Sequence, residues 1–174
     1  MKFVSFLTTI ILFMAAGQVF AHDHMNSRVA DEKAINSLMD DFHDAAAKAD
    51  QGRYLGYFTR DGVFMGTDDW ERWPLNPDFR TYVAERFKDG KGWAYKAVER
   101  HIAFSPDAKV AWFDEITTSE KWGLFRGTGV LFKEDQGWTV AHYSMSVLGP
   151  NEVWVAVSDL AKAAVKRRNA EKEE

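Results

Sequence analysis

Three side chains in the second half of the chain have the chemistry of a proton-transfer site. Asp114, Arg126 and His142 lie in three successive stretches of strand-type sequence. Because alternate residues of a strand share a face, Asp114 lies on the face of Trp112. By the same rule, His142 lies on the face of Ser144. If these faces line one pocket, Asp114 or His142 could remove a proton next to a carbonyl, and Arg126 could stabilise the resulting enolate. Asp114 and His142 are therefore the candidate catalytic residues under the interpretation that the pocket belongs to an enzyme.

Each of these residues also has a purely structural interpretation. Asp114 and Arg126 could form an ion pair that only stabilises the sheet. His142 could be a hydrogen-bonded core residue. His43 could be a surface residue, and Tyr54 could serve only in packing. The sequence leaves these alternatives open. The predicted pocket walls share an aromatic ring or a polar group that suits a small ligand. They are His43, Tyr54, Phe58, Trp73, Trp93, Trp112, Arg126 and Ser144.

Hydrophobic spacing predicts the elements that position these residues. Ile35, Met39, Phe42 and Ala46 form the apolar stripe of a helix from about Asp31 to Asp50. Further helical segments are expected at 53–58, at 78–88 and from about 152 onward, with a charged tail over 166–174. Strands are expected at 63–66, 93–105, 110–118, 122–133 and 137–148, and a short helix or loop at 68–73.

Short connections between the last four strands predict antiparallel neighbours, with helices covering one face of the sheet. The fold class is therefore α+β. A resemblance to a known family rests on five motifs. They are GTDDWERW at 66–73, Gly90–Trp93, Val110–Glu115, Arg126–Leu131 and Gly137–Ser146.

Together these motifs make residues 31–150 resemble the SnoaL-like branch of the nuclear transport factor 2-like superfamily. The resemblance implies a cone-shaped fold in which about three N-terminal helices cover a strongly bent antiparallel sheet, with an added C-terminal helix. It also implies a pocket between helices and sheet, and a homodimer packed through the sheet. The superfamily includes ketosteroid isomerases, polyketide cyclases, epoxide hydrolases, dehydratases and members without catalysis, so the fold does not select an activity.

The N-terminus has the pattern of a secretory signal peptide. Lys2 precedes the apolar run Phe3–Ala16, and Val19–Ala21 suits a cleavage site. We expect removal of residues 1–21, a flexible segment at 22–30, and a periplasmic or secreted protein; a membrane anchor is the alternative. Cleavage after Ala21 would leave His22-Asp23-His24 at the new terminus, which is a nitrogen set suited to Cu(II) or Ni(II).

Composition narrows the classes of partner. The formal net charge of −4 argues against a nucleic-acid partner, and the absence of cysteine excludes disulfides and thiolate metal sites. No cofactor motif is present, so no cofactor is expected. The sequence predicts an exported domain that binds a small, partly apolar ligand, without a membrane segment in its mature form. An isomerase, cyclase or dehydratase and a non-catalytic assembly module are the alternatives.

Overall fold

The computed structural model describes the backbone of residues 4–172 and the side chains of residues 26–172. The side chains of the proposed signal peptide, His22 and His24 lie outside the described residues. No helix in the described part of the chain is long and apolar enough to cross a membrane. The predicted boundaries of the signal peptide and of the folded domain stay predictions.

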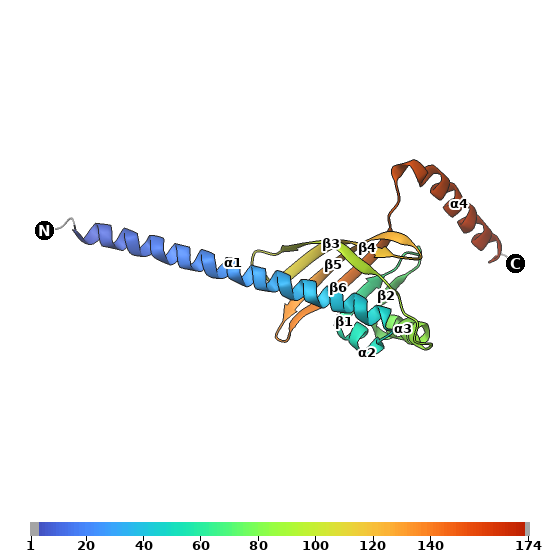
Figure 1. Ribbon diagram of the computed structural model, residues 1–174, viewed down its shortest axis with the longest axis horizontal. Helices are drawn as coiled ribbons and strands as arrows, with labels where there is room; N and C mark the ends of the chain where they lie inside the picture. Colours follow the sequence, from blue (N-terminus) through green and yellow to red (C-terminus); the bar gives the residue numbers. More distant parts are fainter. Residues whose placement is uncertain (1–3, 173–174) are drawn as a thin grey trace.

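Six strands form one bent, open sheet in the order β2-β1-β6-β5-β4-β3. Neighbouring strands are antiparallel except for β1 and β6, which pair in parallel. Helices cover one face of this sheet, so the predicted α+β class is confirmed (Figure 1). The strands are β1 (Phe58–Met65), β2 (Arg72–Pro74), β3 (Lys96–Phe104), β4 (Val110–Ser119), β5 (Gly123–Glu134) and β6 (Gly137–Val147). The helices are α1 (Val4–Ala47), α2 (Gln51–Gly56), α3 (Arg80–Phe87) and α4 (Trp154–Ala170), with short helical turns at Leu75–Phe79 and Asn151–Val153.

Helix α1 supplies the main cover of the sheet. Its predicted apolar stripe is confirmed, since Ile35, Met39, Phe42 and Ala46 are all buried. The helix begins at Val4 rather than near Asp31, so the stripe seen in the sequence is only its C-terminal part. Asp31 also joins α1 to the β5–β6 hairpin, because its carboxylate accepts hydrogen bonds from Lys133 and Trp138.

The sheet has an inner face, which the helices cover, and an outer face, which they do not. On β4 the buried residues alternate with more exposed ones, so Phe113 and Glu115 face inward, and Trp112 and Asp114 face outward. The inner face packs against a core of aromatic rings. Phe64, for example, stacks on Phe79 with ring centres 4.6 Å apart. The inner face is therefore the one on which a ligand could be enclosed between helices and sheet.

A close approach between α1 and the segment before β3 brings Trp93 under the helices. The backbone N–H of Trp93 donates to the carbonyl oxygen of Ala46 at 3.1 Å. A Cβ atom added at Gly92 would lie 1.6 Å from the same oxygen, so only glycine fits there. The Gly90–Trp93 motif thus places an aromatic ring beside the C-terminal end of α1.

Candidate functional site

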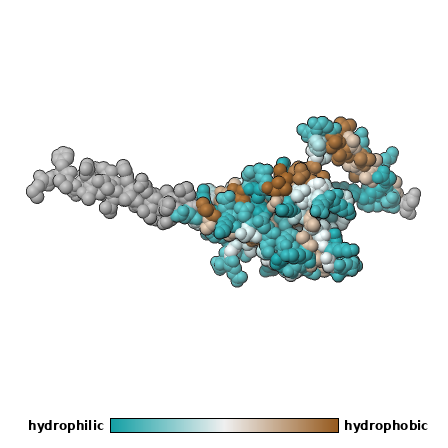
Figure 2. All heavy atoms as spheres, in the orientation of Figure 1, coloured by the Kyte–Doolittle hydropathy of each residue, from teal (hydrophilic) through white to brown (hydrophobic). Residues whose placement is uncertain are grey.

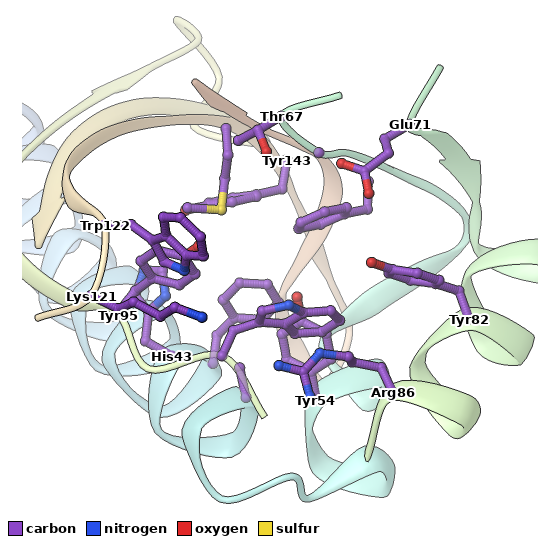
Figure 3. A pocket seen from close by; sticks show the side chains of 16 residues that line it. His43, Tyr54, Thr67, Glu71, Tyr82, Arg86, Tyr95, Lys121, Trp122 and Tyr143 are labelled. Atoms are coloured by element: carbon purple, nitrogen blue, oxygen red, sulfur yellow. The ribbon is translucent and has the colours of Figure 1, made fainter. Parts of the chain in front are cut away.

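A pocket of about 340 Å³ lies on the inner face, between the helices and the part of the sheet next to the β4–β5 turn. Its walls are mostly aromatic: Tyr82 stacks near Trp93, with ring centres 5.8 Å apart, and Tyr54 lies 6.1 Å from the same indole. The other rings that line it are Phe42, Phe64, Tyr95, Trp122 and Tyr143. Figure 3 shows Tyr54 from α2, Tyr82 from α3, Trp122 from the β4–β5 turn and Tyr143 from β6 arranged around one space.

Charged groups occupy the rim of the pocket. Arg86 comes from the last turn of α3, Lys121 from the β4–β5 turn, and Glu71 from the loop before β2 (Figure 3). The carboxylate of Glu71 accepts a hydrogen bond from the backbone N–H of Asp68 at 3.1 Å. The pocket therefore combines an apolar interior with charges at its opening, which is the usual design of a small-molecule site.

Beneath the pocket, a buried polar cluster forms around Glu115. His43 Nε2 lies 2.7 Å from Glu115 Oε1, and the hydroxyl of Tyr143 donates to the same oxygen at 2.9 Å. Both His43 and Tyr143 also line the pocket. The cluster thus links the helix layer, through His43, to the inner face of β4 and β6.

Arg100 fixes the second carboxylate oxygen of this cluster. It stands directly opposite Glu115 in the β3–β4 register, and its Nε donates to Glu115 Oε2 at 2.9 Å. The guanidinium also donates to Asn36 Oδ1 and Asp40 Oδ1, each at 3.0 Å. Glu115 is therefore held on both oxygens, by the sheet on one side and by α1 on the other.

These contacts determine the protonation states of Glu115 and Tyr143. Burial alone would raise the pKa of Glu115, but the His43 hydrogen bond and the charges of His43 and Arg100 outweigh it and leave that pKa below its ordinary value. Burial, together with the Glu115 charge, raises the pKa of Tyr143 well above its ordinary value. Glu115 is thus an anion that accepts hydrogen bonds from the Tyr143 hydroxyl and from His43 Nε2. In neutral His43 the proton on Nε2 faces Glu115, and Nδ1 has no hydrogen-bond partner among residues 26–172, so it can accept a proton.

The charged groups at the rim change the pKa values of two nearby tyrosines, Tyr82 and Tyr95. Burial raises the pKa of Tyr82 and of Tyr95, and the Glu71 carboxylate raises both further, whereas Arg86 opposes that rise. Glu71 and Arg86 therefore both act on the same part of the pocket. Burial also raises the pKa of Tyr54 well above its ordinary value. All three phenols remain neutral hydrogen-bonding groups near neutral pH.

Some residues predicted for the pocket are found there, and others are not. His43, Tyr54 and Trp93 line it. Phe58 lies behind the wall as a buried core residue, 5.8 Å from Phe42 between ring centres. Trp73 stacks on Tyr82 from outside, at 4.7 Å. The five remaining residues lie on the outer face and do not line the pocket. They are Trp112, Asp114, Arg126, His142 and Ser144.

The predicted placement of the proton-transfer residues is therefore wrong, although they do share one face. On β6 a bulge causes the error: Val130 pairs with His142 but Leu131 pairs with Val140, so Ala141 is an extra residue. Simple alternation puts His142 on the face of Val140, whereas the bulge turns His142 outward and Tyr143 inward. His142 Nε2 lies 3.2 Å from Met65 Sδ, on the outer face of β1.

On β4 and β5 the face that carries Asp114 and Arg126 is the outer one, whereas the sequence predicts that it lines the pocket. Glu115, not Asp114, faces the helices, and Arg126 is exposed. The glycines of β5 are the sequence feature that could have identified the inner face. A Cβ at Gly127 would lie 2.5 Å from the Tyr143 hydroxyl, and one at Gly129 would lie 2.4 Å from the ring of Phe113. Two glycines at alternate positions thus mark the face against which large side chains pack. Sequence reasoning missed Glu71, Tyr82, Arg86, Arg100, Glu115, Lys121 and Tyr143.

Comparisons with known proteins agree with the observed fold. Residues 35–150 match a family model described as a SnoaL-like domain. A comparison with curated proteins found no match. Three solved structures, all under 20% identical to the chain, share the fold.

The first is a domain of unknown function with a cystatin-like fold from Nostoc punctiforme. It is 16% identical with a TM-score of 0.60, and the alignment covers 82% of this chain and 93% of that one. The second, from Novosphingobium aromaticivorans, is assigned as an aromatic ring hydroxylase. It is 19% identical with a TM-score of 0.59, covering 70% and 92%. The third, from Parabacteroides distasonis, is assigned as a ketosteroid isomerase. It is 15% identical with a TM-score of 0.53, covering 67% and 86%.

Proposed function

We propose that this chain, which belongs to the SnoaL-like family, binds a small, largely apolar ligand with at least one ring in its inner-face pocket. The fold of this family suggests a small-molecule-binding or isomerase-type domain. The observation that carries the proposal is the pocket itself. Its volume of about 340 Å³ lies within the range of ligand sites, and aromatic rings form its walls.

Calorimetric titration with 2-naphthamide, a neutral two-ring amide, tests this proposal. The matched variants are Met145→Trp and Ser146→Trp, because Met145 lines the pocket and its neighbour Ser146 faces outward. We expect binding to the native chain and to Ser146→Trp, and a loss of binding in Met145→Trp, where the new indole fills the pocket. Equal binding by both variants, or no binding by the native chain, would contradict the proposal.

A second candidate function is proton-transfer catalysis in the same pocket. Here His43 is the base, because Glu115 orients its ring through Nε2 at 2.7 Å and leaves Nδ1 to accept a proton. His43 would remove a proton next to a ketone and return it at another carbon, so the reaction is an isomerisation without an added reactant. This assignment replaces Asp114 and His142, which lie on the other face.

The isomerisation of cyclohex-3-en-1-one to its conjugated isomer, followed by ultraviolet absorbance, tests this candidate. His43→Gln should lower the rate by about 10²–10⁴-fold, the usual contribution of a general base. His142→Gln, on the outer face, should keep the native rate. A native rate in His43→Gln, with folding checked by circular dichroism, would refute the assignment.

We also propose that two copies pack through the outer face of the sheet. Apolar side chains on this face are open to solvent, with Trp112 49% exposed and Phe132 44% exposed. Figure 2 shows apolar residues gathered along one edge of the body and on α4. Such a patch is typical of an interaction surface. Sedimentation velocity should show a native dimer that Trp112→Lys dissociates and Trp70→Lys preserves; a native monomer would contradict this.

Export remains a separate proposal that rests on the N-terminal sequence alone. Intact-mass measurement of the protein from its native cells should give the mass of residues 22–174. A mass that includes residues 1–21 would contradict cleavage.

A further inference from the structure

Two cationic side chains lie at the rim where the pocket opens. Arg86 and Lys121 line the pocket, and both also line an adjoining surface hollow of about 580 Å³. Trp93 and Trp122 are shared between the two spaces in the same way. Residues that border both spaces form the boundary between them. This boundary therefore presents two positive charges and two indole rings to a ligand in the pocket.

Lys121 is poised to receive an anion. Its ammonium group points toward the middle of the pocket in Figure 3 and lies 4.5 Å from the centre of the Trp122 ring. Within residues 26–172, carboxylates pair with Lys48, Lys88, Lys133 and Lys162, but none pairs with Lys121. The indole holds the charge in place without neutralising it.

Arg86 is anchored but keeps free donors. Its Nη1 donates to the carbonyl oxygen of Lys91 at 2.6 Å, and its Nη2 donates to that of Gly92 at 3.4 Å. The guanidinium also lies 5.5 Å from the centre of the Trp93 ring. Two of its five N–H donors are thus used to fix its position, and the other three have no partner among residues 26–172.

The charges on the pocket wall do not cancel. Glu71 is the carboxylate that lines the pocket, and it already accepts the Asp68 N–H. The Glu115 carboxylate lies deeper and is paired with Arg100. The rim therefore carries an excess of positive charge in a chain whose formal net charge is −4. A local charge of the opposite sign attracts an anionic ligand to the opening.

We infer that the ligand of this pocket is a ring-containing carboxylate, with its carboxylate between Lys121 and Arg86 and its ring against Trp93. The inference rests on the proposed ligand-binding function and adds the chemical class of the ligand. Hydrogen bonds to a charged group contribute more than neutral ones, so the carboxylate should be favoured over an uncharged amide of the same shape.

Paired calorimetric titrations with 2-naphthoate and 2-naphthamide test the inference. The native chain should bind the carboxylate about tenfold more tightly than the amide, as expected for one charge-assisted contact. Lys121→Met should remove most of that preference while leaving amide affinity within about twofold. Lys109→Met, a change at the β3–β4 turn away from the pocket, should keep the preference. Higher salt should weaken naphthoate binding only.

The outcomes separate this inference from the function on which it rests. Equal affinity for the two probes, or an undiminished preference in Lys121→Met, would overturn the carboxylate assignment while ligand binding stands. Failure of both probes to bind would overturn the proposed function and the inference with it. Thermal unfolding of each variant, followed by circular dichroism, confirms that the compared proteins are folded.

Discussion

The inner and outer faces of the sheet differ in the burial of their carboxylates and in the side chains that bind them. Glu115 and Asp114 are neighbours in sequence, yet Glu115 is 1% exposed and bound to three side chains, whereas Asp114 is exposed. Their β3 partners follow the same division. Arg100 pairs with Glu115 on the inner face, and His101 stands opposite Asp114 on the outer face. Cover by the helices, not residue type, thus decides which carboxylate can act in a water-poor environment.

The largest expected difference between the faces concerns these two carboxylates. Glu115→Gln removes the charge that Arg100 and His43 share inside the protein, so we expect unfolding free energy to fall by about 3–5 kcal/mol. Asp114→Asn should change it by less than about 0.5 kcal/mol. Urea unfolding at pH 7 measures both. Equal losses would show that the burial of Glu115 does not distinguish the faces.

A smaller difference is expected from the glycines of β5. Gly129→Ala places a methyl group against the ring of Phe113 and the carbonyl oxygen of His142, and overpacking of this kind costs about 1–3 kcal/mol. Thr128→Ala, one residue away on the outer face, should be close to neutral. Thermal unfolding of the two variants makes the comparison. A stable Gly129→Ala would mean that the inner face is less tightly packed than described.

The smallest expected effect is the pH dependence that Glu115 gives to the unfolding free energy. Its folded-state pKa lies below the ordinary 4.5, so the folded state favours the carboxylate. This stabilisation is complete above the unfolded pKa and is lost as pH falls through the folded pKa. The stability gap between the native chain and Glu115→Gln should therefore shrink below about pH 4.5. Urea unfolding of both proteins between pH 7 and pH 3 measures this stability gap. A gap that widens in acid would contradict the lowered pKa of Glu115.

Much of the fold could be predicted from the sequence because local patterns determine it. The apolar spacing from Ile35 to Ala46 identified the covering part of α1, and the last four strands follow short turns. The parallel pairing of β1 with β6 was not accessible in this way. It joins segments about 80 residues apart, and no turn connects them.

The site was less predictable because it depends on which side of each strand the helices cover. On β4 both faces carry apolar and acidic residues, so alternation alone does not orient it. On β6 one extra residue, Ala141, exchanges the faces of everything that follows. His43, Tyr54 and Trp93 were identified because they lie on helices or beside a glycine turn, where the side that faces the sheet is easier to infer. The inward orientation of Glu115 and Tyr143 could be assigned only from the strand register.

The central claim is that ligand binds on the inner face. Nitrogen-15 NMR of the tryptophan indole N–H signals tests it most directly, because Trp93 and Trp122 line the pocket and Trp112 lies on the outer face. On addition of 2-naphthamide, the Trp93 and Trp122 signals should shift while the Trp112 signal stays in place. A shift confined to Trp112, or no shift of Trp93 and Trp122, would contradict the claim.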